Sequence, residues 1–118
     1  MRIVGTMDDL WTVIPSDEVS AWYLNLPARD QGVVDEMVAM LAALGNRLRM
    51  PHSRPLGGGL FELRFAIQNG TVDQRITYTF DLGRRIIELT TFRKTRDNEK
   101  GQIARARQAK SIYDKERR

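Results

Sequence analysis

Three cations in the second half of the chain have the chemistry to hold a phosphodiester. Arg64 and Arg75 stand at alternating positions of two predicted β-strands, and Lys94 follows a third. Guanidinium groups stay protonated and donate paired hydrogen bonds to phosphate oxygens, which suits the stabilisation of a pentavalent transition state. A lysine can act as a base where nearby cations and partial burial lower its pKa. These residue types therefore predict a site for a phosphodiester.

Alternation along the strands decides which side chains share a face. We predict strands at Leu60–Ile67, Gln74–Phe80 and Arg85–Phe92, with turns at Asn69-Gly70 and at Gly83. Successive side chains of a strand point to opposite faces, so an apolar set is expected to face the helices and a polar set to face away. The expected apolar set is Phe61, Leu63, Phe65, Ile76, Tyr78, Phe80, Ile87 and Leu89. The expected opposite set is Glu62, Arg64, Arg75, Thr77, Glu88, Thr90, Phe92 and Lys94.

An antiparallel meander with helices on only one side leaves its second face open to solvent. We therefore expect the three cations and the Phe92 ring to converge on an uncovered surface. The competing interpretation is that Glu62 and Glu88 simply pair with the arginines across the strands, each pair contributing a fraction of a kcal/mol. A β-bulge in any strand would invert part of the assignment.

The remaining elements must position this surface. Trp11–Ile14 predicts a short strand ended by Pro15, and Ser16 predicts the N-cap of a helix that carries Val19, Trp22, Tyr23 and Leu26 inward. A second helix begins at Pro27 or Ala28 and ends at Gly45, because its apolar residues recur with helical spacing. Residues Arg47 to Gly59 are expected to form a loop.

A last helix, capped by Asp97 or Asn98, carries Ile103, Ala106, Ala109 and Tyr113 on one flank. The sequence leaves open whether this helix covers the sheet, packs on a partner or detaches. The fold class that follows is α+β: a small antiparallel sheet with two N-terminal helices packed on one face and a basic C-terminal helix.

Composition limits the possible functions. The 118 residues suit a single domain, 1–118, and 42% hydrophobic residues suffice for an ordinary core. Cysteine is absent, which excludes disulfides, thiolate metal sites and cysteine nucleophiles. The one histidine, His52, lies in the expected loop, where an ordinary surface role is favoured over catalysis. We expect no metal and no cofactor. The longest apolar run, from Met37 to Leu44, is too short to span a membrane, so a cytoplasmic protein without membrane contact is expected.

Charge is concentrated at the C-terminal end. Residues 1–92 contain 9 basic and 11 acidic side chains, whereas residues 93–118 contain 10 basic and 4 acidic ones. Such a segment attracts phosphate backbones, with an affinity that depends strongly on salt. Arg93, Arg96 and Lys100 are therefore expected to bind RNA, although a merely solvated helix explains the same composition.

Several segments together resemble the RelE/ParE toxin superfamily, specifically its HigB-like, phage-related branch. They include Trp22-Tyr23 with Leu26, Leu44-Gly45, the run Leu56 to Arg64, Arg75 to Tyr78, Ile87 to Lys94, and Ile103 to Ala106. The resemblance covers roughly Ser16 to Ala109. It implies a toxin of a type II toxin–antitoxin pair that cleaves messenger RNA on the translating ribosome. It also implies an antitoxin with a helix-turn-helix domain, through which the pair reaches its own operator DNA.

In that family, the residues matching Arg64, Arg75 and Lys94 are expected to grip and polarise the RNA phosphate. Phe92 would offer a stacking surface for a base, and Glu62 would be a general base or, more simply, a clamp on Arg64. Several relatives carry a histidine or tyrosine near the end of the last strand, where this chain has Thr90, Thr91 and Phe92. Either other groups perform the acid–base chemistry here, or nuclease activity is weak or absent.

Two alternative functions remain open from the sequence. A ParE-type toxin would inhibit DNA gyrase and need no catalytic side chains, and a non-catalytic module would bind RNA without producing new ends.

Overall fold

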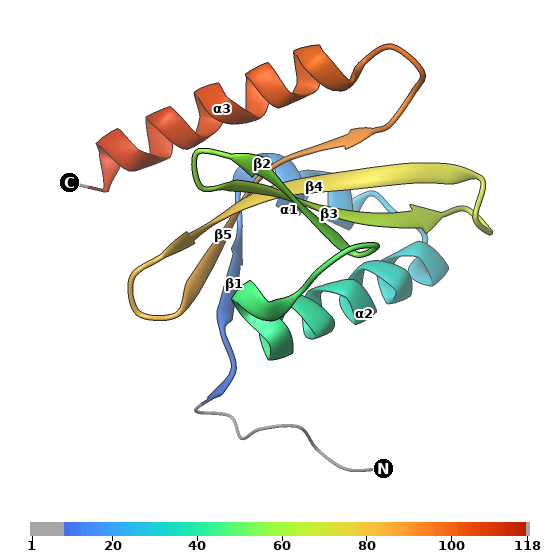
Figure 1. Ribbon diagram of the computed structural model, residues 1–118. Coiled ribbons are helices and arrows are strands. Elements are labelled where there is room, and N and C mark those ends of the chain that lie inside the picture. Colours follow the sequence, from blue (N-terminus) through green and yellow to red (C-terminus); the bar gives the residue numbers. More distant parts are fainter. Residues whose placement is uncertain (1–8, 118) are drawn as a thin grey trace.

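A five-stranded sheet with the order β1-β5-β4-β3-β2 forms the centre of the computed structural model, which describes residues 9–117 (Figure 1). The strands are β1 (Thr12–Pro15), β2 (Ser53–Gly57), β3 (Leu60–Ile67), β4 (Val72–Asp81) and β5 (Arg85–Arg93). Strands β3 to β5 form the predicted antiparallel meander, β2 pairs with β3 in antiparallel fashion, and β1 pairs with β5 in parallel. The α+β prediction is confirmed, with one parallel edge strand that makes the sheet mixed.

Helices α1 (Asp17–Leu24) and α2 (Ala28–Leu44) cover one face of the sheet. Ser16 is the N-cap of α1, as predicted, and its Oγ accepts a hydrogen bond from the Val19 backbone N–H at 3.2 Å. The buried core between these helices and the sheet contains Val19, Val34, Met37, Leu41, Leu63, Ile76, Tyr78 and Ile86. Burial of this apolar stripe is what fixes both helices on the sheet.

Helix α2 ends at Gly45, as predicted, and the chain continues into a short 3-10 turn, η2 (Gly45–Arg47). The backbone of Gly45 has a φ of +53°, and a Cβ at this position would lie 2.1 Å from Nε1 of Trp11. Only glycine therefore fits where the indole of Trp11 closes the core against the end of α2.

The expected loop at Arg47 to Gly59 is wrong in its second half, because Ser53–Gly57 forms strand β2. Pro55 argued against a strand, but β2 is the edge of the sheet and pairs only with β3. A proline on an edge strand sacrifices no ladder hydrogen bond on its free side. This strand brings Arg54 opposite Glu62.

A β-bulge reverses the predicted faces of the residues in the first half of β5. Thr77 pairs with Thr90, but Tyr78 pairs with Glu88, so one extra residue of β5 lies between the two pairs. Glu88 therefore lies on the α1/α2 side and not with the cations. Ile87 and Leu89 lie on the opposite side, contrary to the prediction, while Thr90 and Phe92 share a face with Arg75 as expected.

Helix α3 (Glu99–Glu116) crosses the second face, so that face is not open as expected (Figure 1). Ala106 packs with Leu60, Ile87 and Leu89 in a second, smaller core, flanked by Leu56, Ala109 and Tyr113. Helix α3 therefore covers part of the sheet face that was expected to be open to solvent. None of the helices within residues 9–117 is both long and apolar enough to cross a bilayer.

Candidate functional site

Two of the three cations predicted to share a face, Arg64 and Arg75, meet around one carboxylate, that of Glu62 on β3. Its Oε2 lies 2.9 Å from Nε of Arg54, 3.6 Å from Nε of Arg75 and 3.7 Å from Nε of Arg64. Glu62 is only 1% exposed. Arg64 and Arg75 are direct cross-strand partners, so the phase of β3 and β4 places their side chains together, as predicted. Glu62 thus orients three guanidinium groups at once.

Arg75 is the enclosed member of this cluster, with a side chain that is 5% exposed. Its Nη1 donates to Oδ1 of Asp73 at 2.7 Å and its Nη2 donates to Oδ2 of the same carboxylate at 3.3 Å. Both ends of the guanidinium are therefore occupied by protein carboxylates. Arg75 therefore stabilises the cluster. Its guanidinium group can bind a phosphate only after the ion pair with Asp73 is broken.

Arg64, Arg54 and Lys94 form the accessible side of the cluster. Their side chains are 27%, 34% and 20% exposed, respectively. Among the described residues, the hydrogen-bond partner of Arg64 Nη1 is the sulfur of Met50, a weak acceptor at 3.1 Å. Arg64 is therefore the cation best able to exchange its present contact for a phosphate oxygen. Arg54, which the sequence analysis missed with its strand, adds a fourth cation to the site.

The first residue of α3 supplies a counter-ion to the accessible cations. Glu99 accepts a hydrogen bond from Nη2 of Arg54 at 2.9 Å, and its other oxygen lies 3.9 Å from Nζ of Lys94. The hydrogen bond from Arg54 and the charges of Arg54, Lys94 and Arg75 lower the pKa of Glu99 below its usual value. A carboxylate thus lies between two of the cations that a phosphate would need.

Phe92 does not have the predicted role. It is the cross-strand partner of Arg75 and is only 6% exposed, so its ring packs within the protein and offers no free face to a base. Arg93, Arg96 and Lys100 are exposed, as RNA-binding residues must be. Within residues 9–117, their charged groups form no ion pair or side-chain hydrogen bond. They flank the segment between β5 and α3, beside the cluster.

The only histidine lies next to Arg64 in the sheet, a position the sequence did not indicate. The backbone N–H of Arg64 donates to the backbone carbonyl of His52 at 2.8 Å, and His52 is partly buried. Imidazole is the side chain that exchanges a proton near neutral pH. This backbone hydrogen bond places His52 beside Arg64, one residue before β2 begins.

Comparison with known proteins defines the family. The model of the phage-derived Gp49-like proteins matches residues 21–111. The chain belongs to this family. Among solved structures, this Gp49-like chain resembles the crystal structure of the toxin–antitoxin complex RelBE2 from Mycobacterium tuberculosis, with a TM-score of 0.52 and 20% identity over 72% of this chain and 99% of that chain. A comparison with curated protein sequences gave no match.

At 20% identity the structural likeness is one of fold. The family match confirms the phage-related, Gp49-like part of the predicted resemblance, and the structural likeness shows a fold shared with a chain of the RelBE2 complex. In this Gp49-like chain, three arginines surround a buried glutamate, and two of them have accessible guanidinium groups that suit an anionic ligand.

Proposed function

We propose that this chain is the toxin of a type II toxin–antitoxin pair, and that it cleaves messenger RNA on the translating ribosome. The observation that carries the proposal is the cluster of Arg54, Arg64 and Lys94, three partly exposed cations linked through the carboxylates of Glu62 and Glu99. The family match and the RelE-like fold support it. The cognate antitoxin, with a helix-turn-helix domain, is the proposed partner, and operator DNA is reached only through it.

The proposed reaction uses the substrate's own 2′-hydroxyl as nucleophile. Its oxygen forms a bond to the adjacent phosphorus while the bond to the 5′-oxygen breaks, which leaves a 2′,3′-cyclic phosphate and a 5′-hydroxyl end. The 2′-hydroxyl loses a proton and the leaving oxygen gains one. The protein has to orient the linkage and stabilise the negative charge on the phosphate, which are tasks for fixed cations.

Each cation has a distinct proposed role. Arg64 donates paired hydrogen bonds to the phosphate oxygens, because its guanidinium has the weakest present contacts. Lys94 neutralises the same phosphate from the end of β5. Arg75, the third predicted catalytic cation, holds the cluster through Glu62 and Asp73 and approaches the phosphate when Asp73 gives way. His52, beside Arg64, is the proposed group for proton transfer.

Arg93, Arg96 and Lys100 are proposed to hold the surrounding RNA backbone, because they are exposed and without ionic partners among the described residues. Contacts of this kind carry no sequence information and weaken with salt. Binding of the chain to ribosomes is therefore expected to fall steeply between low and physiological ionic strength.

The test is primer-extension mapping of a messenger RNA translated by purified ribosomes, with wild-type chain and with Arg64→Ala. We expect Arg64→Ala to lower the cleavage rate by at least about 100-fold, the usual effect of losing one transition-state donor. Arg29→Ala is the matched control, because Arg29 is an exposed arginine on α2, across the sheet from the cluster. It should cleave at the wild-type rate.

The outcomes separate the proposal from its alternatives. Wild-type cleavage by a folded Arg64→Ala variant would place the site elsewhere. RNA that is bound without new ends would identify a non-catalytic binding module. Inhibition of DNA supercoiling by gyrase, with translation unaffected, would identify a ParE-type toxin.

A further inference from the structure

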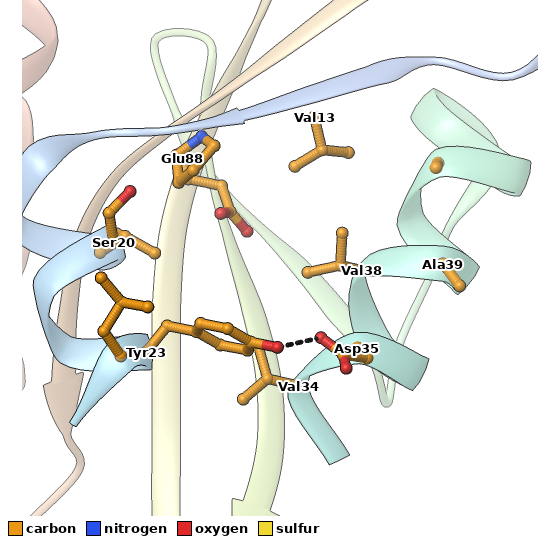
Figure 2. Close-up of a pocket in the computed structure, with 12 residues that line it drawn as sticks. Val13, Ser20, Tyr23, Val34, Asp35, Val38, Ala39 and Glu88 are labelled. Atoms are coloured by element: carbon orange, nitrogen blue, oxygen red, sulfur yellow. Dashed lines mark hydrogen bonds between the residues drawn. The ribbon is translucent and has the colours of Figure 1, made fainter. Parts of the chain in front are cut away.

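A second site lies on the opposite side of the sheet from the cations. A pocket of about 610 Å³ opens between α1, α2 and β1, and the carboxyl group of Glu88 reaches into it from β5 (Figure 2). Aliphatic side chains form most of its walls, among them Val13, Val19, Val34 and Val38. The volume falls within the range of sites that bind small molecules.

Glu88 is the feature that the fold does not explain. The residue is 3% exposed, and its Oε2 is enclosed without a hydrogen-bond partner among residues 9–117. The described residues that line the pocket include no lysine, arginine or histidine. Burial raises the pKa of Glu88 to about 7, because nothing compensates the loss of water around its charged form. An unpartnered buried carboxyl group costs free energy in any protonation state.

The other polar groups of the pocket do not serve Glu88. The hydroxyl of Tyr23 donates to Oδ1 of Asp35 at 2.7 Å, a bond that joins α1 to α2 at the rim. Asp35 adds a second carboxylate, so the pocket combines apolar walls with two acidic groups. A ligand that fits this surface has an apolar body and a donor that carries positive charge.

We propose that this pocket binds a small apolar molecule with a protonated amine, whose ammonium group pairs with Glu88 while its hydrocarbon part packs against the valine walls. A slender free molecule fits this space, because α1, α2 and β1 bound it and the Tyr23–Asp35 bridge lies at its rim. The site is separate from the cation cluster, and the inference does not depend on the proposed nuclease activity.

The test is a chemical-shift titration of the isotope-labelled chain with n-hexylammonium at pH 8, with n-hexanol and hexanoate as comparison ligands. At this pH most Glu88 is ionised and the amine is protonated. We expect shifts centred on Val13, Val19 and Val38. Glu88→Gln should weaken binding about tenfold or more, since it removes a charge-assisted hydrogen bond.

A second variant keeps the result independent of any effect of Glu88 on folding. Ala39 lines the pocket from the exposed side of α2, so Ala39→Leu fills space without entering the core, and we expect it to weaken hexylammonium binding. Ala104→Leu, at an exposed position of α3, is the control and should bind as wild type does.

Three results would overturn the assignment. The first is hexanol or hexanoate binding as tightly as hexylammonium, and the second is equal hexylammonium affinity of wild type and Glu88→Gln. The third is that hexylammonium does not bind, while a partner protein binds the wild-type chain and loses that binding with Ala39→Leu. This result would reassign the pocket to a protein interface.

Discussion

Replacing the buried Glu88 by glutamine should change how the stability of the chain depends on pH. The pKa of this carboxyl group rises from 4.5 to about 7 in the folded protein because burial disfavours its charged form. The folded state therefore keeps a proton that the unfolded state has already lost. The contribution of Glu88 to the stability is fully present below pH 4.5 and is lost as the pH rises through about 7.

The size of the effect follows from the two pKa values. One pKa unit corresponds to about 1.4 kcal/mol, so a rise from 4.5 to about 7 corresponds to about 3 kcal/mol of lost stability above pH 8. Glutamine has nearly the same shape and carries no charge. Glu88→Gln should thus match wild type near pH 4.5 and exceed it by about 3 kcal/mol at pH 8.

Urea unfolding at pH 4.5, 6, 7 and 8 measures this difference directly. Taking the difference between variant and wild type cancels the titration of the other carboxyl groups. Glu36→Gln is the control, because Glu36 is exposed on α2 and makes no ion pair among the described residues, and its difference from wild type should stay near zero. A Glu88→Gln curve parallel to that of wild type from pH 4.5 to 8 would refute the reasoning.

Three further predictions concern the cation cluster and the core. Glu99→Gln should tighten RNA binding by up to about fivefold, because it frees Arg54 from an ion pair worth at most about 1 kcal/mol. Filter binding at fixed salt measures the RNA affinity. An unchanged affinity would mean that Glu99 does not compete with RNA for Arg54. Glu62→Gln should lower the free energy of unfolding by about 3 kcal/mol, since a buried carboxylate that faces three guanidinium groups is removed, and urea unfolding checks it. Gly45→Ala should destabilise the chain by about 2–4 kcal/mol through strain and a clash with Trp11; thermal unfolding within 2 °C of wild type would contradict this.

The helices and strands that were predicted correctly are those in which the spacing of apolar residues along the segment is enough to identify the element. Helix α2 has an apolar stripe with helical spacing, and β3 and β4 alternate strictly, so their faces follow from the residues alone. Strand β2 was missed because its Pro55 and the three glycines after it are typical of loops, and whether such a segment lies at a sheet edge depends on tertiary pairing. The parallel pairing of β1 with β5 is likewise a long-range property.

The phase of β5 shows why face assignments can fail over part of a strand. Ile86 and Ile87 are adjacent and both apolar, so the sequence fits either phase, and only the bulge opposite Thr77 and Tyr78 decides between them. The residues beyond the bulge kept their predicted face, whereas Glu88 changed sides. That change removed Glu88 from the cation site and placed it in the apolar pocket, where no described residue pairs with its carboxyl group.

Arg64, Arg75 and their shared counter-ion Glu62 were predictable, but Arg54 and the counter-ion Glu99 were not. Arg64 and Arg75 follow from strand alternation, whereas the approach of Glu99 requires the position of α3 over the sheet. The competing interpretation, that glutamates on this face simply pair with Arg64 and Arg75, is confirmed for Glu62, which contacts both of these arginines. Ion pairing and phosphate binding are compatible, because a buried carboxylate that fixes guanidinium groups pre-organises them for a second anion.

The enclosed position of Arg75 and the exposed position of Glu99 have different consequences for activity. A phosphate that displaces Glu99 exchanges one carboxylate for another anion at a partly exposed place, at small cost. Displacing Asp73 from Arg75 exposes a guanidinium that is now 5% exposed, at greater cost. The substrate should therefore first engage Arg64, Arg54 and Lys94, and reach Arg75 only as negative charge develops on the phosphate. Interactions that strengthen in this order raise the rate of the chemical step more than the affinity for RNA.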